Sequence, residues 1–170
     1  GAPTALPLVL ALGLAACGGQ TVSAEGEGRG ALSLEEATIR GIHDAFASGT
    51  LACVQLVEYY LRRVEAYDDQ GPALNAILTV NPRALETARE MDRLYAADVT
   101  DGRPLHCIPV IVKDNYDTHD MPTTGGSASL EGAMAADDAY QVRAIREAGA
   151  IVLAKSNLAE FAFTAMETVG

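Results

Sequence analysis

Apolar residues between positions 33 and 98 recur at intervals of three or four, which is the spacing of helices that bury one face. The first such stretch follows Ser33, and Glu36 lies three residues later, as in a capping box. Gly49 is a typical helix terminator. We therefore predict an amphipathic helix that begins at Ser33 and ends before Gly49.

The next stretch predicts a second helix, a strand and a third helix. The second helix is expected to begin at Thr50 and to end before the Gly71-Pro72 break. Residues 74–80 form an apolar segment that we interpret as a strand. Asn81-Pro82 then opens a third helix, because proline is favoured at the first helical position.

From residue 100 onward the pattern is that of an α/β protein. Residues 106–112 and 150–154 are rich in aliphatic side chains, and we interpret both as buried strands, the first buried on both faces. A helix is expected between them, after Asp137 and Asp138, and residues 115–118 are a candidate for a further short strand. The strand–helix–strand order implies an α/β layer with some parallel pairing.

A lysine ends each of these two strands, Lys113 the first and Lys155 the second. Lysine is seldom buried, so Lys113 has two interpretations. In one, its stem packs while its ammonium group reaches water. In the other, its amine is held out of water and uncharged, so that it can act as a base near neutral pH. Because α/β proteins place their sites at strand ends, Lys113 is our candidate catalytic residue.

The first 31 residues resemble processing sequence. Residues 5–16 form an apolar run of signal-peptide length, too short to span a bilayer as a helix. The run ends in Leu-Ala-Ala-Cys at Cys17, which resembles a bacterial lipobox, where the thiol receives a diacylglyceryl group. We predict a signal peptide over residues 1–17, with Cys17 as the lipid attachment site; a non-lipidated secretory peptide is the alternative. Residues 18–31 are glycine-rich and predict a flexible linker to a domain over residues 32–170.

Charge and composition narrow the possible partners. Lys plus Arg is 12 and Asp plus Glu is 23, so the net charge is −11, which argues against binding to a phosphate backbone. There is no Trp for a stacking platform. His43, His106 and His119 share no metal-ligand spacing. We therefore expect no nucleic-acid partner and no metal.

Two cysteines and one loop of small residues allow more than one interpretation. Cys53 and Cys107 can pair in an exported protein, but sequence spacing does not place their Cα atoms within bridging range, so buried free thiols are the default expectation. The Gly-Gly-Ser run at 125–127 can cradle an anion or form a plain loop, and we favour the loop. Ser127 and Ser129 are conceivable nucleophiles, although no strand-to-helix elbow frames them.

Three segments resemble the core of the amidase signature family in order and spacing. They are Leu-His-Cys-Ile-Pro-Val-Ile-Val-Lys-Asp-Asn at 105–115, Met-Pro-Thr-Thr-Gly-Gly-Ser at 121–127, and Ala-Gly-Ala-Ile-Val-Leu-Ala-Lys-Ser-Asn-Leu-Ala-Glu-Phe-Ala at 148–162. Residues 33–98, especially 67–75, resemble the helical N-terminal part of these enzymes.

The resemblance implies an α/β amidase signature fold, in which N-terminal helices precede part of a mixed, largely parallel sheet with flanking helices. It also implies a Ser–cis-Ser–Lys triad with Lys113 as the lysine. A neutral lysine takes a proton from a bridging serine, which activates the nucleophilic serine, and backbone N–H groups stabilise the oxyanion. No metal or organic cofactor is implied, the substrate is a small-molecule or peptide amide, and Lys155 matches a position that we take as structural.

The chain departs from the family pattern in two respects. Both family serines belong to a Gly/Ser-rich segment well downstream of the lysine, and the sequence ends at Gly170 before any such segment; Ser127 and Ser129 come too early to be either serine. Cys107 stands where glycine is common in the family. We therefore expect these residues alone to be inactive.

The sequence thus predicts the N-terminal part of an exported, lipid-anchored amidase of a bacterial envelope, in contact with a membrane only through its anchor. Two alternatives stay open. One is the A-type component of a glutaminyl-type tRNA amidotransferase, which would be cytoplasmic. The other is a non-catalytic lipoprotein domain that binds a ligand or partner. The oligomeric state is not set by the sequence.

Overall fold

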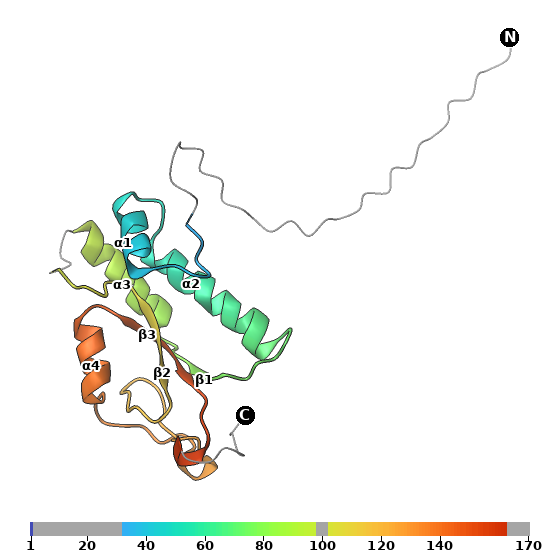
Figure 1. Ribbon diagram of the computed structural model, residues 1–170, viewed down its shortest axis with the longest axis vertical. Coiled ribbons are helices and arrows are strands. Elements are labelled where there is room, and N and C mark those ends of the chain that lie inside the picture. The colour runs from blue at the N-terminus through green and yellow to red at the C-terminus, as the bar shows by residue number, and fades with distance from the viewer. Residues whose placement is uncertain (2–31, 98–101, 163–170) are drawn as a thin grey trace. The chain divides into compact units, whose positions relative to one another are not determined.

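The computed structural model describes residues 32–97 and 102–162 together with Gly1 (Figure 1). The signal peptide and linker predicted over residues 1–31, with the lipid attachment at Cys17, lie outside the described residues and stay predictions. Within the described part of the chain, no helix has the length and apolar character needed to cross a membrane.

Three helices and a short strand form the first half. A π-helical turn, Glu65–Asp69, extends the second helix. The elements are α1 (Ile39–Ala47), α2 (Cys53–Val64), β1 (Ile77–Val80) and α3 (Ala84–Ala96).

The second half contributes two strands joined by a helix, β2 (Pro109–Lys113), α4 (Tyr140–Glu147) and β3 (Ile151–Ser156), with 3₁₀ turns at Ala128–Leu130 and Glu160–Ala162. The sheet order is β1-β3-β2. β2 and β3 run parallel, while β1 and β3 run antiparallel. The predicted α/β class with a mixed sheet is therefore confirmed.

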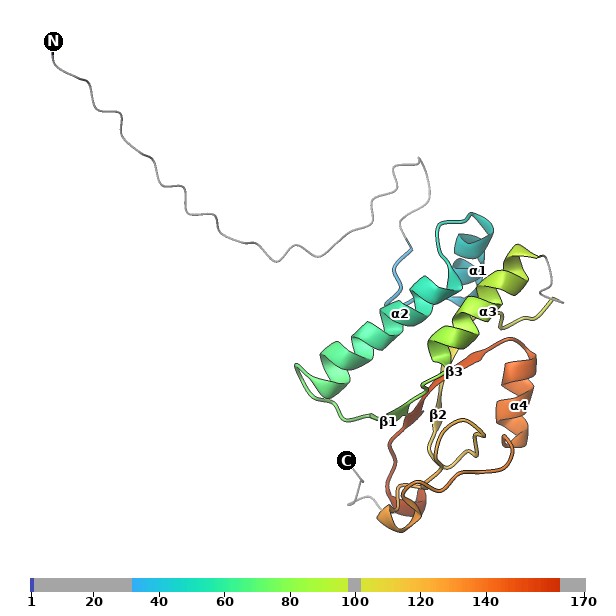
Figure 2. The same cartoon turned by 180° about the vertical axis from the view of Figure 1, so that it is seen from behind.

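β3 is the central strand, and its alternating side chains serve two hydrophobic clusters. Ile151 and Leu153 pack with buried residues of α1, α2 and α3, while Val152 packs into a second cluster with Val112 and with Val142 of α4. Each fully buried aliphatic side chain contributes roughly 1.5–3 kcal/mol. Successive strand side chains point to opposite faces, so helices α1–α3 cover one face of the sheet and α4 covers the other, as both views show (Figures 1 and 2).

β2 lies at an edge of this sheet, so the prediction that it is buried on both faces is wrong. Val112 is buried, but Ile111 is 47% exposed, and the Lys113 side chain is also exposed. The reason is the sheet order: among the described residues, β2 pairs with β3 alone. The further strand predicted at 115–118 is also absent from the described residues, where only an isolated bridge joins Thr118 to Met121.

Two predicted helix starts are wrong by several residues, and each error has a visible cause. The first helix begins at Ile39, because the Thr38 hydroxyl caps it by accepting the Gly41 N–H at 3.0 Å. Ser33 instead donates its hydroxyl to the Glu35 carboxylate at 2.9 Å.

The second helix begins at Cys53 and is capped from a distance. The Asp92 carboxylate of α3 accepts the N–H groups of Cys53 at 2.7 Å and Val54 at 3.0 Å. Sequence reasoning placed the start at Thr50 because it could not see a cap supplied by a residue far along the chain. The predicted third helix is confirmed and begins at Ala84.

The two cysteines of the domain form a disulfide, so the expectation of free thiols is wrong. Cys53 and Cys107 have Cα atoms 5.7 Å apart, within the normal range for a disulfide. Their burial was expected correctly, at 2% and 0% exposure. The 54 residues that separate them hide the pairing from any local pattern.

Candidate active site

Lys113 is the last residue of β2 and lies level with Ser156 in the register of β3. Its carbonyl accepts the Tyr116 N–H at 3.0 Å, which turns the chain away from the strand. Its side chain is exposed and makes no hydrogen bond or ion pair with any other described residue. The described residues therefore do not shield this amine from water, contrary to the expectation of a buried strand end.

The buried lysine is Lys155 of β3, whose side chain has no exposed area. Its Nζ lies 3.1 Å from Oδ1 of Asp114, which is itself 1% exposed. The same Nζ donates to the Pro122 carbonyl at 3.0 Å and to the Thr123 hydroxyl at 2.9 Å. A buried charge needs a partner and full hydrogen bonding, and Lys155 has both, in keeping with the structural role expected for it.

Asp114 also fixes the chain that follows Lys113. Its second carboxylate oxygen accepts the Thr124 N–H at 2.9 Å and the Thr124 hydroxyl. Its backbone N–H donates to the Ser156 carbonyl, and its carbonyl accepts the Gly125 N–H, both at 3.0 Å. The residue next to the candidate base is thus held from three sides.

Sequence reasoning assigned no role to Asp114. A signal was present, because an acid directly follows one predicted strand and a lysine ends its parallel neighbour. Carboxyl ends of parallel strands meet at one edge of a sheet, so the two opposite charges were placed to meet.

The loop at 125–127 is a packed turn and not an anion cradle. The N–H groups of Gly125 and Gly126 already donate, to the Asp114 carbonyl and to the Thr124 hydroxyl at 3.2 Å. Gly126 has φ +73°, and a Cβ there would lie 2.7 Å from the Leu158 carbonyl oxygen. Close backbone approach therefore explains this glycine.

Ser127 and Ser129 do not contact Lys113 among the described residues. Ser127 is 3% exposed and donates its hydroxyl to Glu160 at 2.6 Å. The hydroxyls of Ser127 and Ser129 lie 2.9 Å apart. These contacts make Ser127 a structural hydroxyl that ties the loop to the Glu160–Ala162 turn.

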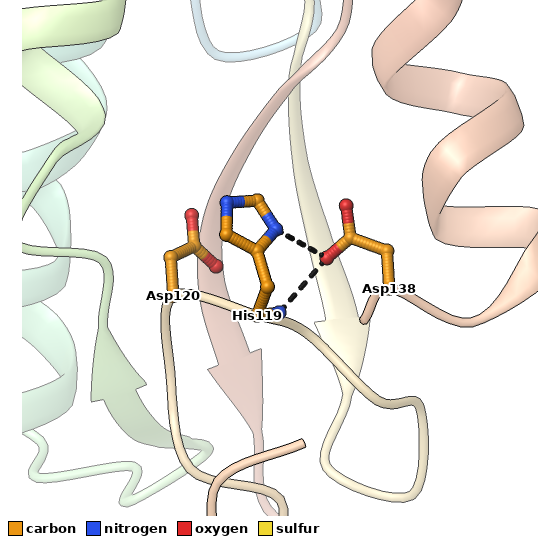
Figure 3. A group of neighbouring side chains, drawn as sticks. All are labelled: His119, Asp120 and Asp138. Atoms are coloured by element: carbon orange, nitrogen blue, oxygen red, sulfur yellow. Dashed lines mark hydrogen bonds and ion pairs between the residues drawn. The ribbon is translucent and has the colours of Figure 1, made fainter. Parts of the chain in front are cut away.

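The loop after β2 brings together three side chains that the sequence did not connect. His119 lies between Asp120 and Asp138, with potential ligand atoms within 4.8 Å of one another (Figure 3). The Asp138 Oδ1 accepts the His119 N–H at 2.9 Å, and the His119 Nδ1 lies 2.8 Å from the same oxygen. Burial acts to raise the pKa of Asp138, but these hydrogen bonds and the Arg146 charge outweigh it, so that the pKa lies below its ordinary value.

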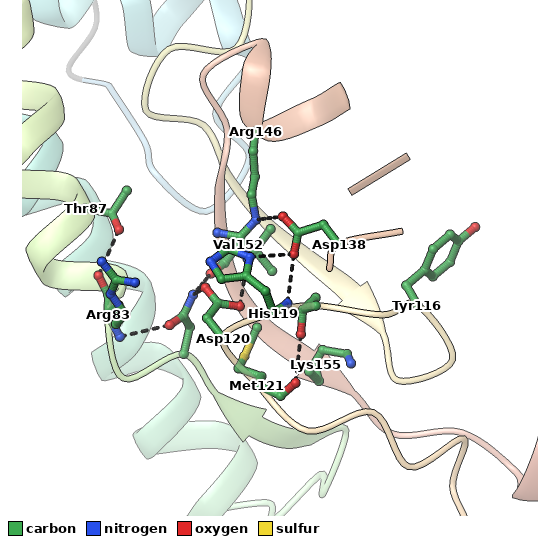
Figure 4. Close-up of polar contacts among 12 residues, drawn as sticks. Arg83, Thr87, Tyr116, His119, Asp120, Met121, Asp138, Arg146, Val152 and Lys155 are labelled. Carbon is green, nitrogen blue, oxygen red and sulfur yellow. Dashed lines mark hydrogen bonds and ion pairs between the residues drawn. The ribbon is translucent and has the colours of Figure 1, made fainter. Parts of the chain in front are cut away.

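Arg146 of α4 compensates both carboxylates of this group. Its Nη2 donates to Asp120 at 2.8 Å, and its Nε lies 3.1 Å from Asp138 (Figure 4). Asn81 donates to Asp120 at 2.9 Å and to the Val152 carbonyl at 2.8 Å. A divalent cation would have to displace the guanidinium, so the arrangement is best suited to bracing the loop between β2 and α4.

An open hollow of about 460 Å³ lies beside this loop. Asp117, Thr123 and residues 133–139 line it. Lys113 is not among the lining residues, so the described residues do not join this hollow to the candidate base.

The fold and the position of Lys113 place the chain among α/β proteins whose functional side chains follow the carboxyl ends of parallel strands. The family model described as Amidase matches residues 55–168, which include both lysine-ended strands. The chain belongs to the amidase signature family.

Similar proteins of known sequence and structure agree with this assignment. A probable amidase of Arabidopsis thaliana is 42% identical over 132 residues, which are 76% of this chain and 25% of that protein. The A-type component of the glutamyl-tRNA(Gln) amidotransferase of Zea mays is 41% identical over 126 residues, 73% of this chain and 23% of that protein. The solved peptide amidase of Stenotrophomonas maltophilia is 41% identical with a TM-score of 0.71, over 74% of this chain and 26% of that one. The chain thus spans about a quarter of the length of these proteins.

Proposed function

We propose that the protein is an amidase that hydrolyses a linear amide bond of a small molecule or peptide, with Lys113 as the base of a Ser–cis-Ser–Lys triad. The neutral lysine accepts a proton through a bridging serine, and the activated serine oxygen attacks the amide carbonyl. The amine leaves with a proton, and water then releases the acid. Both serines belong to sequence outside these 170 residues.

The observation that carries this proposal is the position of Lys113 within the family match. It ends a strand parallel to β3, and the next residue, Asp114, is held by the buried Lys155. Such an anchored strand end suits a general base, because catalysis depends on holding the base within hydrogen-bond reach of the group that it deprotonates.

The exposure of Lys113 sets a condition on the mechanism. A base must lose its proton, and contact with bulk water favours the charged form of lysine. The proposal therefore requires further sequence to cover the free edge of β2 and the amine. The relatives are long enough to do so, since the matched region is about a quarter of their length.

Substitution of Lys113 in the full-length protein tests the mechanism. Lys113→Ala should lower kcat/KM for a small amide by about 10²–10⁴-fold. Lys113→Arg should be as impaired, because arginine keeps the charge but does not give up its proton. Arg143→Ala, which removes an exposed cation of α4, is the control and should keep full activity.

Unchanged hydrolysis by Lys113→Ala would remove Lys113 from the mechanism and favour a protein that only binds its ligand or partner. The 170-residue chain alone should hydrolyse none of the amides that the full-length protein cleaves, because it holds the base without either serine. Any turnover by this chain would contradict the assignment of both serines to later sequence.

A second candidate is the A-type component of a tRNA amidotransferase, favoured by the 41% identity to the Zea mays protein. The two functions differ in their partners and in their compartment. An amidotransferase component should release ammonia from glutamine and purify from the cytoplasm with the rest of its complex. The amidase should act alone on simple amides.

We also propose that the protein is exported and lipid-anchored. The leader over residues 5–16 and the lipobox-like Cys17 support this proposal, and so does the Cys53–Cys107 disulfide, because such bonds persist mainly in oxidising compartments. Cys17→Ser should move the protein from the membrane fraction to the soluble fraction of the envelope. If Cys17→Ser still sediments with membranes, the anchor is not at this cysteine.

A further inference from the structure

The disulfide joins two segments that other contacts already hold in place. Cys53 is the first residue of α2, and its N–H is held by the Asp92 carboxylate at 2.7 Å. Cys107 lies two residues before β2, and its N–H donates to the Gly149 carbonyl at 2.9 Å. The bond therefore ties the helical layer to the start of the strand that carries Lys113.

The backbone at Cys107 has a conformation that favours glycine. Its φ is +58°, in the left-handed region where a Cβ is strained. The next residues then enter the sheet, since the Ile108 carbonyl accepts the Ile151 N–H at 3.0 Å. A side chain at position 107 is therefore unfavourable for the turn itself, and its presence needs a compensating contact.

Both cysteines are inside the main hydrophobic cluster. Cys53 is 2% exposed and Cys107 is fully buried, among neighbours that include Leu56, Met91 and Ile151. Thiol–disulfide exchange requires a thiolate to reach a sulfur atom. The folded structure gives a soluble reductant or oxidant no such access.

We propose that Cys53–Cys107 is a permanent structural cross-link, made before the core closes, which compensates for the strained backbone at Cys107 and holds the start of β2 against α2. This inference does not depend on the catalytic role of Lys113. It makes the domain dependent on an oxidant at the time of folding, and it distinguishes the bond from an exposed, reversible redox switch.

The oxidant is a disulfide-bearing exchange partner. One cysteine thiolate attacks a sulfur of that disulfide and releases one partner thiolate. The second cysteine thiolate then attacks the mixed disulfide and releases the other. Two protein thiols are oxidised to one disulfide, the partner disulfide is reduced to two thiols, and the two protons pass to the released thiolates.

Alkylation and mass spectrometry test the persistence of the bond in the full-length protein. Protein denatured in iodoacetamide without reductant should yield linked, unalkylated Cys53 and Cys107 peptides. Treatment of folded protein with millimolar dithiothreitol should leave the link intact, and the same treatment in urea should break it. Alkylation of either cysteine without reductant, or equally fast reduction with and without urea, would overturn the proposal.

Two double variants test the role of the backbone at Cys107. Both Cys53→Ala/Cys107→Gly and Cys53→Ala/Cys107→Ala lack the cross-link and should unfold at lower urea concentrations than the oxidised protein. The glycine variant should be the more stable of the two, because glycine removes the strain at φ +58°. Equal midpoints, or an oxidised protein no more stable than either variant, would overturn the proposal.

The same exchange at an ordinary helical position gives the matched control. Ala144 lies within α4 and is exposed. Ala144→Gly should lower the midpoint, since glycine is unfavourable in a helix. The opposite order of alanine and glycine at positions 107 and 144 is therefore specific to the left-handed turn.

Discussion

Lys113 and Lys155 both end predicted strands, yet the structure gives them opposite surroundings. Lys155 lies in the central strand and is enclosed, while Lys113 ends an edge strand and is exposed. Local sequence cannot separate them, because each follows a run of aliphatic residues. Burial depends on strand order, and strand order is a property of the whole sheet.

Removing the buried lysine should be costly for stability. Lys155→Met leaves the Asp114 carboxylate buried without its cation and should lower the free energy of unfolding by about 3–5 kcal/mol. Adding Asp114→Asn should recover part of this loss. Urea unfolding measures both, and Lys113→Met is the control, with an expected change within about 0.5 kcal/mol. A Lys155→Met loss as small as the control would mean that the pair contributes nothing.

His106 should make the stability fall in mild acid. It is 5% exposed, and burial lowers its pKa, helped by the charges of His43 and Arg103 and opposed by Asp92. The folded state thus favours the neutral ring. Its contribution is complete above the ordinary pKa of about 6.5 and is lost as the pH falls below that value.

Urea unfolding between pH 7 and pH 5 checks this sign. The free energy of unfolding should decrease as the pH falls, and His106→Phe, which keeps a ring beside Tyr95, should flatten the decrease. An unchanged pH dependence in this variant would show that other groups cause the loss.

At the scale of the elements, periodicity predicted the four α-helices and three strands of the described residues but misplaced two helix starts. Asp92 caps α2 from α3, and the Asp68 carboxylate accepts the N–H groups of Ala76 and Ile77 as the chain enters β1. Such contacts join residues that come together only in the fold. The same limit hid the disulfide and the Arg146 contacts, whereas Lys113 and Lys155 were found because each directly follows its own aliphatic run.

Loss of the distant cap should destabilise α2. Asp92→Ala leaves the first N–H groups of α2 without acceptors and should lower the free energy of unfolding by about 0.5–2 kcal/mol. Asp44→Ala on the exposed face of α1 is the control and should change little. Thermal unfolding followed by circular dichroism compares them, and equal midpoints would argue against a stabilising cap.

At the scale of the whole chain, the edge strand β2 creates a risk of association. It has one paired neighbour among the described residues and presents Ile111 to solvent. An unpaired apolar edge is a template for another chain. The net charge of −11 opposes association only in a general way, because it is not concentrated on that edge.

A charge on this edge should keep the 170-residue chain dispersed. Ile111→Lys should reduce light scattering at a given concentration relative to the unmodified chain, because an inserted lysine blocks edge-to-edge pairing. Leu74→Lys, at an exposed position outside the sheet, adds the same charge and should have a smaller effect. Equal effects of the two variants would assign the change to net charge alone.

The enclosure of Lys155 has a practical consequence for chemical labelling. The printed sequence contains only two lysines, and one of them is sealed inside the core. In this part of the molecule, an amine-selective acylating reagent therefore has a single side-chain target, Lys113. The labelling rate at that residue in the full-length protein gives a direct reading of whether the rest of the polypeptide closes over it.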